Sequence, residues 1–286
     1  MPPTADIAPA PQTPPEAPRR RRMSRGVYLL PSVFTIGNML LGFYAVVLGF
    51  RAFGGAGEHL FARAALLVFV AAILDGLDGR IARMVGTESD FGREYDSLAD
   101  AITFGVAPAL LTFFWGLHEF GRVGWLVPVF FMVCCVTRLA RFNVQVKIVD
   151  SRYFVGLPTP AAACAICSIL FFSPDREWQA YMEALVLVSL VVVGMLMVST
   201  FRYKSFKKFD LRRRWSYRAL IPVAAVILVT AIYPPAFFLA ISVLYTLSGP
   251  AAWLWGRLRP RHETVEPPET HEPAAADDDE SLGTPR

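Results

Sequence analysis

"LDGLDGRIARMVGTESDFGREYDSLAD", residues 74–100, places Asp75, Asp78, Asp96 and Asp100 inside and between stretches that are otherwise apolar. At 3.6 residues per turn, Asp75 and Asp78 share one helical face, and Asp96 and Asp100 lie one turn apart on the next helix. The intervening segment "MVGTESDFGREY" contains Gly86 and Gly92 and can reverse the chain. The sequence therefore predicts two helix ends that face one another, each carrying two carboxylates.

Long apolar runs surround this stretch. The chain has 286 residues, of which 54% are hydrophobic, more than a soluble domain usually contains. Runs of roughly 17 to 25 residues, enough to cross a bilayer, recur along it. The predicted spans are about eight: 29–50, 61–84, 97–117, 124–146, 157–173, 180–200, 217–232 and 235–256. Strand and hairpin signals are absent, so we predict an all-α fold, a polytopic membrane helical bundle in one domain over residues 26–258.

The two ends of the chain differ from this domain. Residues 1–25 are rich in Pro and end in a basic run, and residues 259–286 are rich in Pro and acid, so both tails are predicted to be disordered. The net charge is +4, with Lys and Arg gathered in alternate gaps and beside both tails. By the positive-inside rule these basic segments face the cytoplasm. We therefore predict an integral protein of the cytoplasmic (inner) membrane, with both termini and the carboxylates on the cytoplasmic side. A role in nucleic-acid binding has little support, because the basic residues are explained by orientation.

The four carboxylates predict a metal site. Bare carboxylates in a low-dielectric setting cost several kcal/mol per ion unless they are neutralised. No His or Cys lies near them, so Mg²⁺ or Mn²⁺ suits the oxygen ligands better than zinc. Such ions commonly serve phosphoryl chemistry. Gly79 would let a substrate approach the backbone, and Arg83 would supply a charge for phosphate.

Two other interpretations of the acids stay open. Acidic and basic residues at helix ends often form a solvated rim of ion pairs. A cation transporter also carries intramembrane carboxylates, but it predicts acids near the bilayer midplane and paired broken helices.

The spacing D-x-x-D-G-x-x-A-R, eight residues, G-x-x-x-D-x-x-x-D resembles the signature of the CDP-alcohol phosphatidyltransferase family. The positions that carry it are Asp75, Asp78, Gly79, Ala82, Arg83, Gly92, Asp96 and Asp100. The resemblance implies a six-helix core and a polar cavity open to the cytoplasmic leaflet, in dimers. It also implies transfer of a phosphatidyl group from a CDP-linked lipid to an alcohol, with loss of CMP.

The same resemblance implies a role for each position. Asp75, Asp78, Asp96 and Asp100 would bind metal, with Asp100 also the catalytic general base. The residues expected at the CDP-lipid are Asp75, Asp78, Gly79, Ala82, Arg83 and Gly92.

Three further stretches resemble the phosphatidylserine synthase branch: "LPSVFTIGNMLLGF", "DSLADAITFGVAPA" and "RLARFNVQ". The substrates implied are CDP-diacylglycerol and L-serine. The serine carboxylate needs a cation, for which Arg138 and Arg141 are candidates, with Asn143 adding hydrogen bonds. The arginines could instead hold anionic lipid headgroups. Glycerol 3-phosphate, inositol phosphate or choline remain alternative acceptors.

Overall fold

The computed structural model describes residues 26–85, 90–145, 153–174, 179–204, 228, 230 and 232–258. The two tails that the sequence predicts to be disordered, 1–25 and 259–286, lie outside this description. The elements are α1 (Gly26–Arg51), η1 (Ala52–Ala56), α2 (His59–Val85), α3 (Asp90–Asp100), η2 (Ala101–Val106), α4 (Ala107–Trp115), η3 (Leu117–Phe120), α5 (Gly121–Gln145), β1 (Tyr153–Val155), α6 (Thr159–Phe172), α7 (Gln179–Val198), β2 (Arg202–Lys204) and α9 (Pro234–Leu258).

The predicted membrane bundle is confirmed. Six helical stretches in the described part of the chain are long and apolar enough to span a bilayer: Val33–Ala56, His59–Ile81, Phe91–Trp115, Leu117–Val144, Tyr181–Val198 and Pro234–Trp255. The predicted span at 157–173 is a shorter apolar helix, α6, of 14 residues. The predicted span at 217–232 lies almost entirely outside the described residues. The chain is therefore built as an integral membrane protein.

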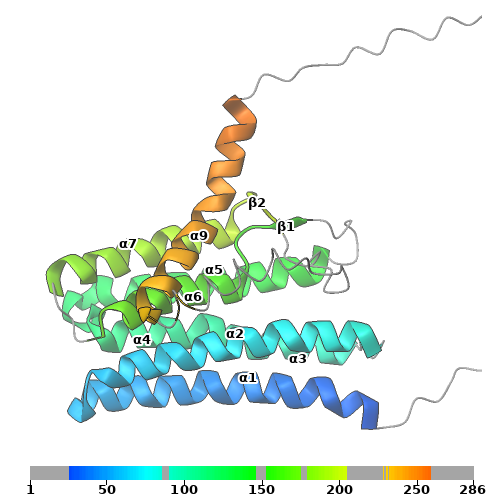
Figure 1. Cartoon of the computed structure of the whole chain (residues 1–286), viewed down its shortest axis with the longest axis horizontal. Helices are drawn as coiled ribbons and strands as arrows, with labels where there is room; N and C mark the ends of the chain where they lie inside the picture. The colour runs from blue at the N-terminus through cyan, green and yellow to red at the C-terminus, as the bar shows by residue number, and fades with distance from the viewer. Residues whose placement is uncertain are drawn as a thin grey trace, which may run out of the picture.

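The first half of the bundle is organised around α1. This helix lies along α2, as Figure 1 shows, and it also packs against α3, η2 and α4. Gly42 allows a close backbone approach, because a Cβ added there would lie 2.8 Å from the Cα of Thr103. Thr103 belongs to η2, a π-helical segment that directly follows Asp100. Only a residue without a side chain lets the two backbones come so near, so Gly42 fixes α1 against the end of α3.

The second half is organised around α6, which packs against α2, α7 and α9. Its fully buried side chains are Ala162, Ala163, Ile166, Cys167, Ser168 and Leu170. The end of α6 is capped by another helix, because the indole Nε1 of Trp115 donates to the carbonyl oxygen of Ser173 at 3.1 Å. In Figure 1, α9 crosses the other helices steeply and its C-terminal part extends beyond them.

A short β-ladder departs from the expectation that strands are absent. Strands β1 and β2 pair antiparallel, with Phe154 opposite Tyr203. Each strand has three residues, too few for an alternating pattern to stand out in the sequence. Tyr203 is fully buried, and its hydroxyl donates to the carbonyl oxygen of Thr246 on α9 at 3.1 Å. Burial raises the pKa of Tyr203 to about 12, so the phenol remains a hydrogen-bond donor that joins the ladder to α9.

Candidate functional site

Three of the four aspartates meet in one cluster. Asp75 comes from α2, and Asp96 and Asp100 come from α3. Each offers a carboxylate oxygen, and these oxygens all lie within 4.8 Å of one another. Asp75 and Asp96 are half-buried, whereas Asp100 is only 8% exposed. The two helices that carry these acids both pack against α1, which brings the carboxylates together.

Asp78 is held slightly apart by α1. The Oγ1 hydroxyl of Thr35 donates a hydrogen bond of 2.7 Å to Oδ2 of Asp78, and both side chains are buried. Asp78 stays close enough to Asp75 and Asp96 to interact with both electrostatically. All four predicted acids therefore belong to one polar region, with Asp78 fixed on its α1 side.

Asp100 is also held by α1. The Nδ2 amide of Asn38 donates to Oδ1 of Asp100 at 3.2 Å, and Asn38 is 1% exposed. The main-chain carbonyl of Asn38 in turn accepts a hydrogen bond from Oγ1 of Thr103 at 3.2 Å. These contacts join α1, the end of α3 and η2 at the most buried of the three clustered carboxylates.

The contribution of α1 to the site was not predicted from the sequence. Thr35, Asn38 and Gly42 are spaced by three and four residues and share one face of an apolar helix. Two buried polar residues and a glycine on one face of a membrane helix are a signal of close packing against a polar partner. That signal was present, but it did not identify which acids the polar residues would reach.

The aspartate cluster fits a divalent cation. Several carboxylates within 4.8 Å of one another, partly withdrawn from solvent, repel unless a positive charge neutralises them. An all-oxygen donor set of this kind is the one that hard divalent ions prefer. Asp75, Asp96 and Asp100 could each supply a ligand, with Asp78 close by.

Arg138 is the predicted acceptor residue that lies beside the cluster. It comes from α5, is 7% exposed, and its guanidinium donates to Oγ1 of Thr159 at 3.3 Å. It interacts electrostatically with both Asp75 and Asp100. Its Nε has no hydrogen-bond partner among the residues that the structure describes. A buried guanidinium therefore lies within electrostatic range of two of the carboxylates, with part of its donor capacity unused.

The other two predicted acceptor residues have structural partners. The guanidinium of Arg141 donates to the main-chain carbonyls of residues 197–199 at the end of α7, with distances of 2.8 to 3.4 Å. Asn143 donates to Oε2 of Glu94 at 3.1 Å and exchanges hydrogen bonds with Ser97. Arg141 thus stabilises a helix end, and Asn143 ties α5 to α3.

The remaining motif positions lie where α2 ends and α3 begins. Gly79 is half-buried on α2, one residue after Asp78, and Gly92 is exposed in the first turn of α3. Ala82 and Arg83 belong to the last turns of α2, but their side chains lie outside the description. The predicted CDP-lipid residues thus lie on the C-terminal part of α2 and the first turn of α3.

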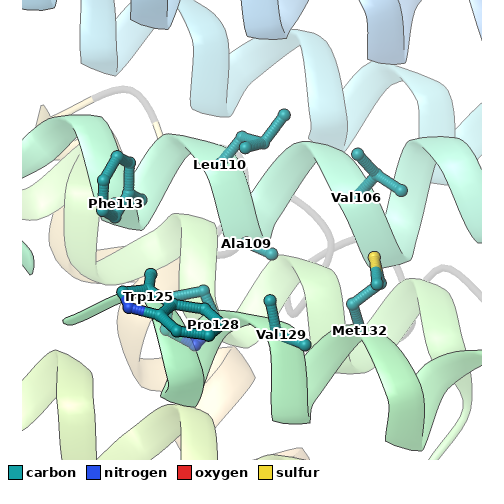
Figure 2. A pocket seen from close by; sticks show the side chains of 8 residues that line it. All are labelled: Val106, Ala109, Leu110, Phe113, Trp125, Pro128, Val129 and Met132. Carbon is teal, nitrogen blue, oxygen red and sulfur yellow. The ribbon is translucent and has the colours of Figure 1, made fainter. Parts of the chain in front are cut away.

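A separate groove between α4 and α5 is unsuited to this chemistry. Figure 2 shows its lining side chains, which are Val106, Ala109, Leu110, Phe113, Trp125, Pro128, Val129 and Met132. Its volume is about 190 Å³, and every lining side chain is apolar or aromatic. Such a lining suits hydrocarbon rather than charged groups, so the aspartate cluster is the candidate site.

Comparisons with known proteins agree with this geometry. The family model described as CDP-alcohol phosphatidyltransferase matches residues 28–196. A Helicobacter pylori protein named CDP-diacylglycerol–serine O-phosphatidyltransferase is 36% identical over 230 residues, covering 80% of this chain and 92% of that protein. Proteins of the same name from Bacillus subtilis and Methanocaldococcus jannaschii are each 31% identical, over 179 and 195 residues. These matches cover 63% and 66% of this chain, and 92% and 84% of the relatives.

Proposed function

Because the chain belongs to the CDP-alcohol phosphatidyltransferase family, we propose that it transfers the phosphatidyl group of CDP-diacylglycerol to the hydroxyl of L-serine, releasing CMP. The observation that carries the proposal is the meeting of Asp75, Asp96 and Asp100, whose carboxylate oxygens lie within 4.8 Å of one another. Serine is chosen as the acceptor because the relatives from Helicobacter pylori and Bacillus subtilis are named as serine O-phosphatidyltransferases, and each aligns with this chain over 92% of its own length.

The proposed cofactor is Mg²⁺ or Mn²⁺, held by Asp75, Asp78, Asp96 and Asp100. The family depends on divalent metal in general, and the oxygen-only donor set agrees with these two ions. When bound, such an ion would neutralise charge on the diphosphate and make CMP a better leaving group.

Asp100 is the proposed general base. As the serine oxygen forms its bond to the lipid-side phosphorus, the bond from that phosphorus to the CMP oxygen breaks, and the hydroxyl proton passes to Asp100. A carboxylate is basic enough, because a hydroxyl attacking through a loose transition state loses its proton late. Asn38 orients this base by donating to its Oδ1.

The remaining predicted roles surround this centre. Gly79, Ala82, Arg83 and Gly92 are proposed to contact the cytidine diphosphate, together with Asp75 and Asp78. For the serine carboxylate we favour Arg138, since it lies beside the carboxylates, with part of its donor capacity unused. The roles of Arg141 and Asn143 in acceptor binding stay predictions.

A transporter receives less support from the structure. α2 runs unbroken through Asp75 and Asp78, and α3 runs unbroken to Asp100. Transporter ion sites are typically built on discontinuous helices, whereas these acids lie on continuous ones.

We further propose that the domain over residues 26–258 lies in the cytoplasmic membrane as a homodimer, with both termini and the site on the cytoplasmic side. A cysteine added at either terminus should then react with a membrane-impermeant maleimide in inverted vesicles and stay protected in spheroplasts. Chemical crosslinking in native membranes tests the dimer, which predicts a product of twice the chain mass.

An acceptor screen tests the activity. The full chain, purified in detergent with Mg²⁺ or Mn²⁺, should release CMP from CDP-diacylglycerol when L-serine is added. Far less CMP should be released when glycerol 3-phosphate, inositol phosphate or choline replaces L-serine. CMP release with glycerol 3-phosphate but not with serine would assign a different acceptor and overturn the proposal.

A further inference from the structure

We infer that Asn38 and Arg138 form an amino-acid recognition site around Asp100, in which Asn38 Oδ1 accepts a hydrogen bond from the acceptor's ammonium and Arg138 Nε donates to its carboxylate. The inference rests on the proposed function, because it concerns how the acceptor is held. It assigns a binding role to Asn38 on α1, for which the sequence suggested none.

Asn38 has an unused acceptor at a buried position. Its Nδ2 is occupied by Oδ1 of Asp100, and its main-chain carbonyl by Thr103. Its Oδ1 has no partner within the described part of the chain, although the residue is 1% exposed. Folded proteins leave few buried polar atoms unpaired, so an orphaned acceptor in a reaction site points to a donor that arrives with the substrate.

Arg138 has the complementary property. One terminal nitrogen donates to Thr159, and the Nε donor has no partner among the described residues. Burial of a guanidinium is unfavourable unless anions and acceptors surround it. The acids of the cluster supply negative charge, and a carboxylate on the acceptor would take up the remaining donor.

The two unpaired atoms belong to side chains that both interact with Asp100. Asn38 is hydrogen-bonded to it, and Arg138 interacts with it electrostatically. The base therefore has a buried acceptor group on one neighbour and a buried donor group on another. An α-amino acid with a side-chain hydroxyl matches this set, because it offers an ammonium, a carboxylate and the hydroxyl proton to three different residues.

This matching set favours serine over the other acceptors. Glycerol 3-phosphate and inositol phosphate offer Asn38 only neutral hydroxyl donors, which hydrogen-bond more weakly than an ammonium. Choline has a quaternary ammonium that cannot donate a hydrogen bond, and it has no anion for Arg138. Three separate contacts also distinguish the two enantiomers, so L-serine should be preferred over D-serine.

The test compares acceptors that each lack one group. The amine is absent from 3-hydroxypropionate, and the carboxylate is absent from ethanolamine. For each acceptor, kcat/KM for CMP release is measured with the full-length protein, Asn38→Leu, Arg138→Met and the control Thr112→Val. Thr112 is buried on α4, and its hydroxyl donates to main-chain carbonyls of its own helix. Thr112→Val therefore shows the effect of removing a buried polar group that lies outside the proposed recognition site.

Ratios of kcat/KM separate recognition from general damage. Asn38→Leu should lower the rates with all acceptors, because Asn38 also orients Asp100, but it should cut the preference for serine over 3-hydroxypropionate by at least about 10-fold. The preference for serine over ethanolamine should stay within about 3-fold of the unmodified value. Arg138→Met should show the reverse pattern, and Thr112→Val should leave both ratios unchanged.

Unchanged ratios in Asn38→Leu and Arg138→Met would overturn the inference and assign both side chains to positioning Asp100 alone. Should either variant have no measurable turnover, the same ratios are obtained from thermal stabilisation of the purified variant by each acceptor in the presence of CMP. Absence of serine-dependent CMP release by the unmodified protein would instead refute the proposed function.

Discussion

The hydroxyl of Thr35 donates a 2.7 Å hydrogen bond to the carboxylate of Asp78, 43 positions further along the chain. Both side chains are buried. One turn later on α1, Asn38 holds Asp100 in the same way. The first helix thus fixes an acid from each of the two helices that carry the motif.

Thr35→Val should weaken divalent-metal binding. The substitution keeps the side-chain shape but leaves one oxygen of Asp78 without its donor. Loss of a hydrogen bond to a metal ligand typically costs roughly 10- to 100-fold in metal affinity or activity. CMP release measured against Mg²⁺ or Mn²⁺ concentration should shift to higher metal by that factor, with Thr35→Ser close to the unmodified protein. An unshifted metal curve in Thr35→Val would remove Thr35 from the support of the site.

Asp100→Asn should lower turnover strongly while leaving CDP-diacylglycerol binding largely intact. The amide can still accept the hydrogen bond from Asn38 through its oxygen, so the local structure persists. It cannot take the hydroxyl proton, and general-base catalysis typically contributes about 10²- to 10⁴-fold. CMP release should fall by that amount, with the affinity for CDP-diacylglycerol within a few-fold. Glu119→Gln, at an exposed acid outside the cluster, is the matched control, and near-normal turnover in Asp100→Asn would exclude Asp100 as the base.

Gly42→Ala should damage both stability and activity. The new Cβ would lie 2.6 Å from Oγ1 and 2.8 Å from Cα of Thr103, and a backbone atom cannot move aside as a flexible side chain can. Such overpacking typically costs about 1–3 kcal/mol and here would push α1 away from Asp100. Gly37→Ala is the control, because no described atom lies within 4 Å of its added Cβ. Thermal unfolding in detergent and CMP release measure the two effects, and equal behaviour of both variants would contradict the close approach.

Arg141→Lys should lower stability more than serine recognition. Arg141 donates to several carbonyls at the end of α7, and a lysine ammonium cannot reproduce that fork. A loss of about 1 kcal/mol corresponds to a decrease of roughly 2–4 °C in the unfolding midpoint for a domain of this size. The KM values for serine and CDP-diacylglycerol should stay in proportion. A selective rise in the serine KM would instead place Arg141 in the acceptor site.

The sequence predicted the membrane bundle because hydrophobic length is a local property, and it predicted that the aspartates converge because their spacing is a helical one. It could not reveal that Thr35 and Asn38 reach Asp78 and Asp100, since those contacts join residues 43 and 62 positions apart. It also could not separate Arg138 from Arg141. The two arginines are three positions apart in the sequence. Only the packing of α7 shows that Arg141 is the one that donates to main-chain carbonyls.

The short α6 does not match its length to the membrane as the longer helices can. Its 14 residues reach about 21 Å, less than the roughly 30 Å of a hydrocarbon core. Its C-terminal end is hydrogen-bonded to Trp115. In the backbone that precedes α6, Leu157 donates to the carbonyl of Leu196 near the end of α7, and Gly156 donates to that of Phe201, just before β2. Protein groups rather than lipids thus hydrogen-bond the backbone at both ends of α6, so α6 should tolerate bilayers of different thickness. In reconstituted vesicles, lipids with acyl chains two carbons longer or shorter should therefore change the rate of CMP release little.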